Sequence, residues 1–101
     1  MKTEIEGNSA WIIPGGNIDL TNAERLKEEF EELVEDKDIL HIEIDFKNVK
    51  KIDSSGLGKI LLFHKIMREK GGSIQLKNVN SEYVLKVFDM VDLNQVININ
   101  E

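Results

Sequence analysis

The stretch KIDSSGLG, residues 51–58, places two adjacent serines between an aspartate and a glycine, directly before a long apolar run. A serine hydroxyl can act as a nucleophile, help to bind a phosphate, or accept a phosphoryl group from another protein. Serine and aspartate also cap helices, because a short side chain with an oxygen can accept a hydrogen bond from a free backbone N–H. The spacing around Ser54 and Ser55 discriminates among these roles.

Catalysis by serine is disfavoured by the positions of the two histidines. A serine nucleophile needs a base within hydrogen-bond reach. His64 follows Ser55 by nine positions on one predicted helix, which separates them by about 13 Å along the helix axis. His41 lies on a predicted strand as an ordinary outward-facing residue, and neither serine has the glycine two positions earlier that a nucleophile elbow requires. The spacing therefore does not support a hydrolase.

A nucleotide-binding loop is also disfavoured, although GLGK at 56–59 matches part of the motif of such a loop. The P-loop requires a glycine five residues before the Gly-Lys pair and Ser or Thr after the lysine. Asp53 and Ile60 occupy these positions, and Leu61 stands where the third glycine of G-x-G-x-x-G belongs. The sequence therefore indicates no site for a small-molecule phosphate.

A helix cap explains only part of the motif. Asp53 or Ser54 can accept hydrogen bonds from the first N–H groups of the following helix, a contribution of about 1 kcal/mol. One cap residue is enough for this purpose. The second serine and Gly56 are therefore left without a structural explanation from the sequence.

Alternating strands and helices must position these serines. Apolar residues alternate with polar ones in the strand candidates and recur at helical spacing in the helix candidates. We expect strands over 2–7, 9–16, 39–46, 73–79 and 95–100, and helices over 21–38, over 54–70 and from residue 81. The order β-β-α-β-α-β-α-β predicts one α/β domain over residues 1–101, with helices packed on a mixed sheet.

The ends of these helices carry recognisable signals. Thr21 and Glu24 have the spacing of a capping box, in which each side chain satisfies the other residue's backbone N–H. The pair Gly71-Gly72 is expected to end the second helix, because a left-handed C-terminal cap favours glycine. Ser81 is expected to cap the third helix. The predicted core face of the first helix consists of Ala23, Leu26, Phe30, Leu33 and Val34.

The second helix carries apolar residues on two sides. Its expected core face consists of Leu57, Ile60, Leu61, His64 and Met67. Leu62, Phe63 and Ile66 fall on roughly the opposite arc. That second arc either contacts a neighbouring helix or forms an apolar docking patch beside Ser55.

Composition excludes several functional classes. The 101 residues contain no cysteine, which excludes disulfides and zinc-thiolate sites, and two histidines give little basis for a metal site or cofactor. The net charge of −6 argues against a nucleic-acid partner, because such binding depends on cations. No apolar stretch approaches the roughly 20 residues that span a bilayer, and MKTEIEGNSA lacks the apolar segment of a signal peptide. We therefore expect a cytoplasmic protein with no membrane partner.

The stretch IEIDFKNVKKIDSSGLGKIL, residues 42–61, resembles the core signature of anti-sigma-factor antagonists of the STAS domain family. GNID at 16–19, the Gly71-Gly72 pair and VFDMVDLNQVI at 87–97 resemble further parts of the family pattern, so the resemblance covers nearly the whole chain. Asp92 stands where the family usually has glycine. Aspartate tolerates the left-handed conformation, so the fold is expected to survive this change.

The resemblance implies that Ser55 is phosphorylated by a serine kinase that is itself an anti-sigma factor. The unphosphorylated form would bind this kinase and free the sigma factor, and a serine phosphatase would reset the switch. Gly56 would let the partner's active site approach the serine. The protein would be a substrate rather than an enzyme, and a monomer or weak dimer. The predicted partner-binding residues are Asp19, Asp53, Ser54, Ser55, Gly56, Leu57, Gly58, Leu62, Phe63 and Ile66.

Two other functional classes remain as alternatives. The same fold could serve as a scaffold or accessory subunit of a transporter or signalling assembly and never be phosphorylated. The intact motif at 53–56 favours the switch, because a scaffold has no need of an acceptor serine. A nucleotide-binding or hydrolytic enzyme is the third class, and it lacks both a base and a phosphate cradle.

Overall fold

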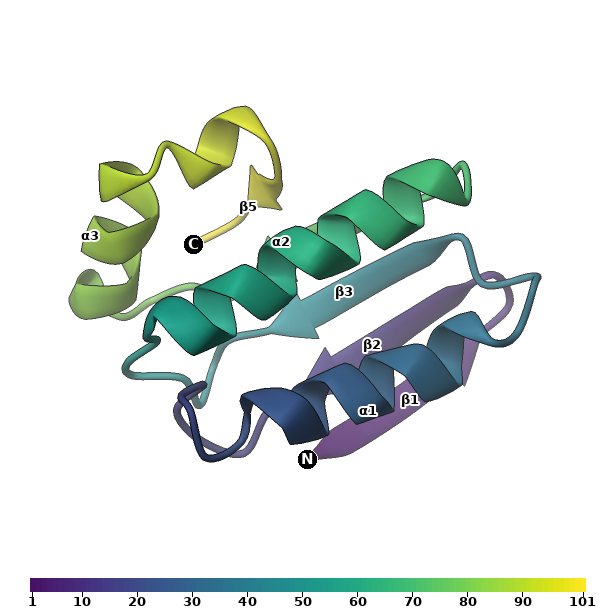
Figure 1. The fold of residues 1–101 in the computed structure, drawn as a ribbon, viewed down its shortest axis with the longest axis horizontal. Coiled ribbons are helices and arrows are strands. Elements are labelled where there is room, and N and C mark those ends of the chain that lie inside the picture. Colours follow the sequence, from purple (N-terminus) through teal and green to yellow (C-terminus); the bar gives the residue numbers. More distant parts are fainter.

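In the computed structural model, which describes residues 1–101, five strands form one mixed sheet in the order β1-β2-β3-β4-β5 (Figure 1). The strands are β1 Lys2–Glu6, β2 Ser9–Ile13, β3 His41–Asp45, β4 Ser73–Lys77 and β5 Asn98–Ile99. β1 pairs with β2 in antiparallel fashion, and every later pair is parallel. The predicted α/β domain with a mixed sheet is therefore confirmed.

The helices connect the parallel strands. They are α1 Ala23–Val34, α2 Ser54–Glu69 and α3 Glu82–Met90, followed by a short 3₁₀ turn, Leu93–Gln95. α1 and α2 run side by side across one face of the sheet, and α3 lies beyond the first turns of α2 (Figure 1). No helix has the length and apolar character required to cross a bilayer.

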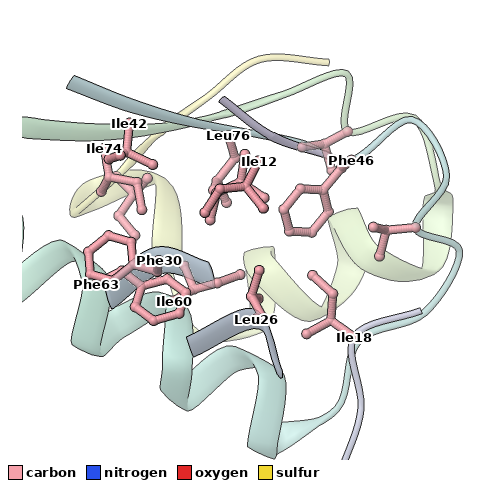
Figure 2. Packing of buried hydrophobic residues seen from close by; sticks show 14 of the residues in the cluster. Ile12, Ile18, Leu26, Phe30, Ile42, Phe46, Ile60, Phe63, Ile74 and Leu76 are labelled. Carbon is pink, nitrogen blue, oxygen red and sulfur yellow. The ribbon is translucent and has the colours of Figure 1, made fainter. Parts of the chain in front are cut away.

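One apolar core lies between the sheet and the helices (Figure 2). The strands supply every second residue to it, because successive side chains of a strand point to opposite faces. β2, β3 and β4 contribute in this way Ala10, Ile12, Ile42, Ile44, Ile74 and Leu76. The helices close the core with stacked rings of Phe30 and Phe63, whose centroids are 4.1 Å apart.

The predicted signals at three helix termini are confirmed. The Asp53 side chain accepts a hydrogen bond from Gly56 N at the start of α2, and the Ser81 side chain accepts one from Val84 N at the start of α3. Gly71, just after α2, has the expected left-handed backbone with φ +83°. Asp92 also adopts this conformation, with φ 51°, as the sequence predicted.

The predicted capping box of α1 is wrong. α1 begins at Ala23, and its cap residue, Asn22, makes no capping hydrogen bond with its side chain. The Thr21 hydroxyl instead donates to Asp19 Oδ1 at 2.6 Å, and the Glu24 carboxylate pairs with Lys59 of α2 at 2.7 Å. Contacts within the preceding loop and with a second helix thus replace the local pairing.

The predicted phase of α2 is also wrong in part. Its buried residues are Gly56, Ile60, Phe63 and Met67. Phe63, expected on the outer arc, is fully buried, whereas Leu61, expected in the core, is 41% exposed. α1 lies beside α2 and receives Phe63 through the stack with Phe30. Phe63 therefore makes the interhelical contact that was one of the two interpretations of this arc, whereas Leu62 and Ile66 are half-buried.

Candidate functional site at the start of helix α2

Asp53 holds two segments together. Its Oδ1 accepts a hydrogen bond from Gly56 N at 3.0 Å, which caps α2, and its Oδ2 accepts one from Leu20 N at 3.0 Å. The Asp53 backbone N–H donates to Ile18 O at 3.2 Å. The sequence predicted the cap but not the link to the loop between β2 and α1, because that link joins residues 33 positions apart.

The loop between β2 and α1 is fastened to the segment before α2 by further hydrogen bonds. Asn17 Oδ1 accepts from the backbone N–H groups of Lys50 and Lys51, at 3.0 and 2.9 Å. Ile18 N donates to Lys51 O at 3.2 Å, and Ile18 pairs with Ile52 in a single parallel β-bridge outside the main strands. These bonds hold residues 17–20 beside the first turn of α2.

Asp19 is ionised at neutral pH and is held by its own loop. Its Oδ1 accepts hydrogen bonds from the Thr21 hydroxyl and from Thr21 N, at 2.6 and 3.0 Å. These bonds, the side-chain one first, lower the pKa of the Asp19 carboxyl. Asp19 N donates to Asn22 Oδ1 at 2.8 Å, and the Asn22 side-chain amide donates to Asn17 O. Asp19 thus contributes a negative charge close to Asp53.

Ser54 and Ser55 open α2 as predicted, and their hydroxyls are free of internal roles. Asp53 already supplies the cap, and neither serine hydroxyl makes a hydrogen bond within the chain. Ser54 is exposed and Ser55 is half-buried. Both side chains belong to the first helical turn, where backbone N–H groups give a helix its positive end. The cap therefore leaves both hydroxyls available for chemistry.

Gly56 is required by the interior of the protein, which corrects the expectation that it makes room for a partner. Gly56 is buried, and a Cβ atom there would lie 2.6 Å from Ile18 Cγ2 and 2.8 Å from Ile18 O. The absent side chain therefore lets α2 pack against the loop before α1. At Gly58 a Cβ atom would meet nothing within 4 Å, so that position is open.

An ion pair that the sequence analysis missed lies beside the serines. Lys59 Nζ is 2.7 Å from Glu24 Oε1 and so joins α2 to the first turn of α1. The hydrogen bond from Lys59, followed by its positive charge, lowers the pKa of the Glu24 carboxyl. The acidic face of α1 and the GLGK segment were each visible in the sequence, but their contact depends on how α1 and α2 pack.

The structure brings together five of the ten predicted partner-binding residues. Asp19, Asp53, Ser54, Ser55 and Gly58 lie around the start of α2 on an accessible surface. The other five lie farther into the protein and differ in how deeply they are buried. Leu57 and Ile66 are half-buried against the core, Leu62 is half-buried, and Gly56 and Phe63 are buried.

Two exposed apolar side chains next to this region were not predicted. Leu20 is 76% exposed, although its backbone is bonded to Asp53. Tyr83 of α3 is 51% exposed, and Lys51 Nζ lies 5.8 Å from the centre of its ring. Tyr83 and Lys51 line a depression of about 180 Å³ together with Asp19 and Asp53. The accessible surface thus combines acidic, basic, hydroxyl and apolar groups.

Comparison with known proteins assigns this arrangement to a described group. The model of the STAS domain family matches residues 2–101. The anti-sigma-B factor antagonist of Bacillus subtilis is 35% identical over 93 residues, which cover 92% of this chain and 83% of that protein. The anti-sigma F factor antagonist of Paenibacillus polymyxa is 31% identical over 82 residues, which cover 81% of this chain and 69% of that protein.

A solved structure gives the same result for the fold. The crystal structure of the Thermotoga maritima protein TM1081 superimposes with a TM-score of 0.90 at 24% identity. The match covers 99% of this chain and 85% of that chain. At this level of identity the comparison shows a shared fold.

Proposed function

The chain belongs to the STAS domain family, and we propose that it is an anti-sigma-factor antagonist switched by phosphorylation of Ser55. In this function the unphosphorylated protein binds an anti-sigma factor that is also a serine kinase, and the sigma factor is released. A phosphate on Ser55 ends the binding, and a serine phosphatase restores it. The two antagonists with which the chain shares 35% and 31% identity support this role.

The observation that carries the proposal is that the Ser55 hydroxyl neither caps the helix nor bonds to another group of the chain. Asp53 caps α2, so Ser55 is not needed for the start of the helix, and its hydroxyl makes no hydrogen bond within the chain. Ser55 is half-buried in the first turn, at the surface formed by α2 and the loop of Asp19 and Leu20. An acceptor serine must be available in this way to a second protein.

The chemistry is a phosphoryl transfer in which this chain supplies only the acceptor. The bond between Ser55 Oγ and the γ-phosphorus of ATP forms as the bond from that phosphorus to the β–γ bridging oxygen breaks. ADP leaves, and the hydroxyl proton passes to a base of the kinase. In this reaction the protein is the substrate and the kinase is the enzyme.

The fold can tolerate this modification. A phosphoserine carries about −1.5 to −2 charges at pH 7. Near a helix N-terminus a negative charge is favoured by the helix dipole, commonly by about 0.3–1 kcal/mol. We therefore expect phosphorylation to leave the fold intact.

Partner binding responds differently to the same charge. A dianion enclosed in a protein interface loses water, which costs several kcal/mol unless a cation compensates it. Because each 1.4 kcal/mol is tenfold in affinity, a loss of about a hundredfold or more follows without any refolding. The exposed Leu20 side chain and the open position at Gly58 lie near the start of α2 and provide contact area for the kinase.

The proposal also fits the charge and location expected of the protein. A net charge of −6 provides no surface suited to a nucleic-acid backbone. We propose a cytoplasmic protein that is a monomer or weak dimer and contacts other proteins.

Phosphate transfer to purified protein tests the acceptor site. The protein is incubated with ATP and its cognate serine kinase, and phosphopeptides are mapped by mass spectrometry. We expect one phosphate, on Ser55, and its loss in Ser55→Ala. Ser54→Ala is the matched control and should still be phosphorylated. Transfer that persists in Ser55→Ala would refute the assignment.

A pull-down with wild type and Ser55→Asp separates the switch from a scaffold role. Under the switch, the wild-type protein retains an ATP-binding partner that Ser55→Asp does not retain. An identical set of partners for both proteins would favour an unphosphorylated scaffold or accessory subunit.

A further inference from the structure

We propose that Lys59 leaves Glu24 and pairs with the phosphate on Ser55, so that modification replaces an interhelical ion pair by one within α2. This inference rests on the proposed function, in that it assumes Ser55 to be the modified residue. It assigns Lys59 as a positioning residue for the phosphate. It also gives the switch a defined structural consequence at the junction of α1 and α2.

The helix geometry places Ser55 and Lys59 on the same side of α2. Residues four positions apart are neighbours on a helix surface. Ser55, Lys59, Leu62 and Ile66 are all half-buried and form one stripe between the buried and exposed sides of α2. This stripe faces α1, because Lys59 reaches Glu24 at 2.7 Å. Ser54 lies on the neighbouring, exposed stripe of α2 together with Gly58 and Lys65.

The charges around Ser55 call for a cation once a phosphate is present. Asp53 lies two residues before Ser55, and hydrogen bonds keep the nearby Asp19 ionised. Lys59 is the only lysine or arginine in the first two turns of α2, residues 54–61. A phosphate at Ser55 would otherwise add its charge beside the carboxylates of Asp19 and Asp53, and the other cation of this region, Lys51, lies against the Tyr83 ring.

The ion pair between Lys59 and Glu24 is suited to exchange. The Glu24 side chain is 69% exposed, so water can replace Lys59 around its carboxylate, whereas the Lys59 side chain is only 23% exposed and stays close to the helix. A phosphate with up to two negative charges attracts the ammonium group more strongly than a single carboxylate does.

The exchange changes the surface that a partner meets. The phosphate becomes partly compensated within the chain, which stabilises the modified protein. The Glu24 carboxylate becomes free at the start of α1 and presents an additional negative charge to the partner. Phosphorylation therefore alters two points of the surface rather than one.

The test measures the second ionisation of the phosphate by ³¹P NMR. Phosphoserine is built into position 55 during synthesis, so no kinase is needed. Because Lys59 favours the dianion, the Lys59→Gln variant should titrate about 0.3 pH unit or more above wild type. Lys59→Arg should restore the lower midpoint. Lys65→Gln removes the same charge from the exposed stripe of α2 and should leave the midpoint unchanged.

Exchange with Glu24 is tested in the same titration. Glu24→Gln should lower the midpoint below that of wild type, because Lys59 is no longer shared, and this effect should shrink in the Lys59→Gln background. Equal midpoints for Lys59→Gln and Lys65→Gln would overturn the inference, as would equal effects of Glu24→Gln in both backgrounds. The kinase assay described above is independent, so failure of either proposal can be recognised separately.

Discussion

Gly56 and Gly58 are separated by one residue in α2 but have opposite surroundings. A Cβ atom at Gly56 would lie 2.8 Å from a backbone oxygen of Ile18, whereas one at Gly58 would meet nothing within 4 Å. Nothing in the sequence motif indicates which of the two glycines is buried and which is open. Only the fold distinguishes them, because Ile18 lies 38 positions before Gly56 and reaches it through the bridge to Ile52.

Alanine substitutions at the two glycines should change stability in opposite directions. Gly56→Ala forces α2 away from Ile18, and overpacking of this kind costs about 1–3 kcal/mol. Gly58→Ala adds a good helix former at an open position and should stabilise by about 0.5–1 kcal/mol. Urea unfolding followed by circular dichroism measures both values. Wild-type stability in Gly56→Ala would contradict the packing described for Ile18.

Other residue assignments succeeded where the determining contact is local. The cap by Asp53 involves Gly56, three residues away, and the Ser81 cap involves Val84 at the same spacing. The second bond of Asp53, to Leu20, and the pairing of Lys59 with Glu24 cross from one element to another. No short-range pattern specifies such contacts, which is why the sequence did not reveal them.

At the scale of elements, the order of strands and helices was predictable but the orientation of α2 was not. Strand alternation and helical periodicity are local signals, and they identified each strand and α-helix of the domain, although the predicted cap of α1 was wrong. α2 carries apolar residues around most of its circumference, so its hydrophobic pattern does not fix one core-facing side. The packing of α1 determines which side of α2 faces the core, because it places Phe30 against Phe63.

Substitutions in α2 test this orientation. Phe63→Ala removes a fully buried ring that stacks on Phe30, and such changes cost about 3–5 kcal/mol. Leu61→Ala alters a side chain that is 41% exposed and should change stability by about 0.5 kcal/mol or less. Thermal or denaturant unfolding of the two variants gives the comparison. A larger loss for Leu61→Ala than for Phe63→Ala would mean that α2 is rotated from the position described.

At the scale of the whole molecule, the candidate site requires no movement of the core. The sheet and the helices packed on it fix the start of α2, and two loops bonded through Asp53 and Asn17 complete the surface. A charge added at Ser55 acts at this surface, whereas the buried cluster lies between the sheet and the helices. The switch we propose is therefore a change of surface electrostatics, with Lys59 and Glu24 as its nearest responding groups.

The affinity of the anti-sigma-factor kinase for two forms of this protein tests the central proposal most directly. One form carries serine at position 55 and the other carries phosphoserine there, and binding is measured by calorimetry with ¹H–¹⁵N spectra as the control for folding. We predict about a hundredfold or greater loss of affinity for the phosphorylated form, with spectral changes confined to the start of α2 and the adjoining residues of α1. Equal affinity of the two correctly folded forms would contradict the account.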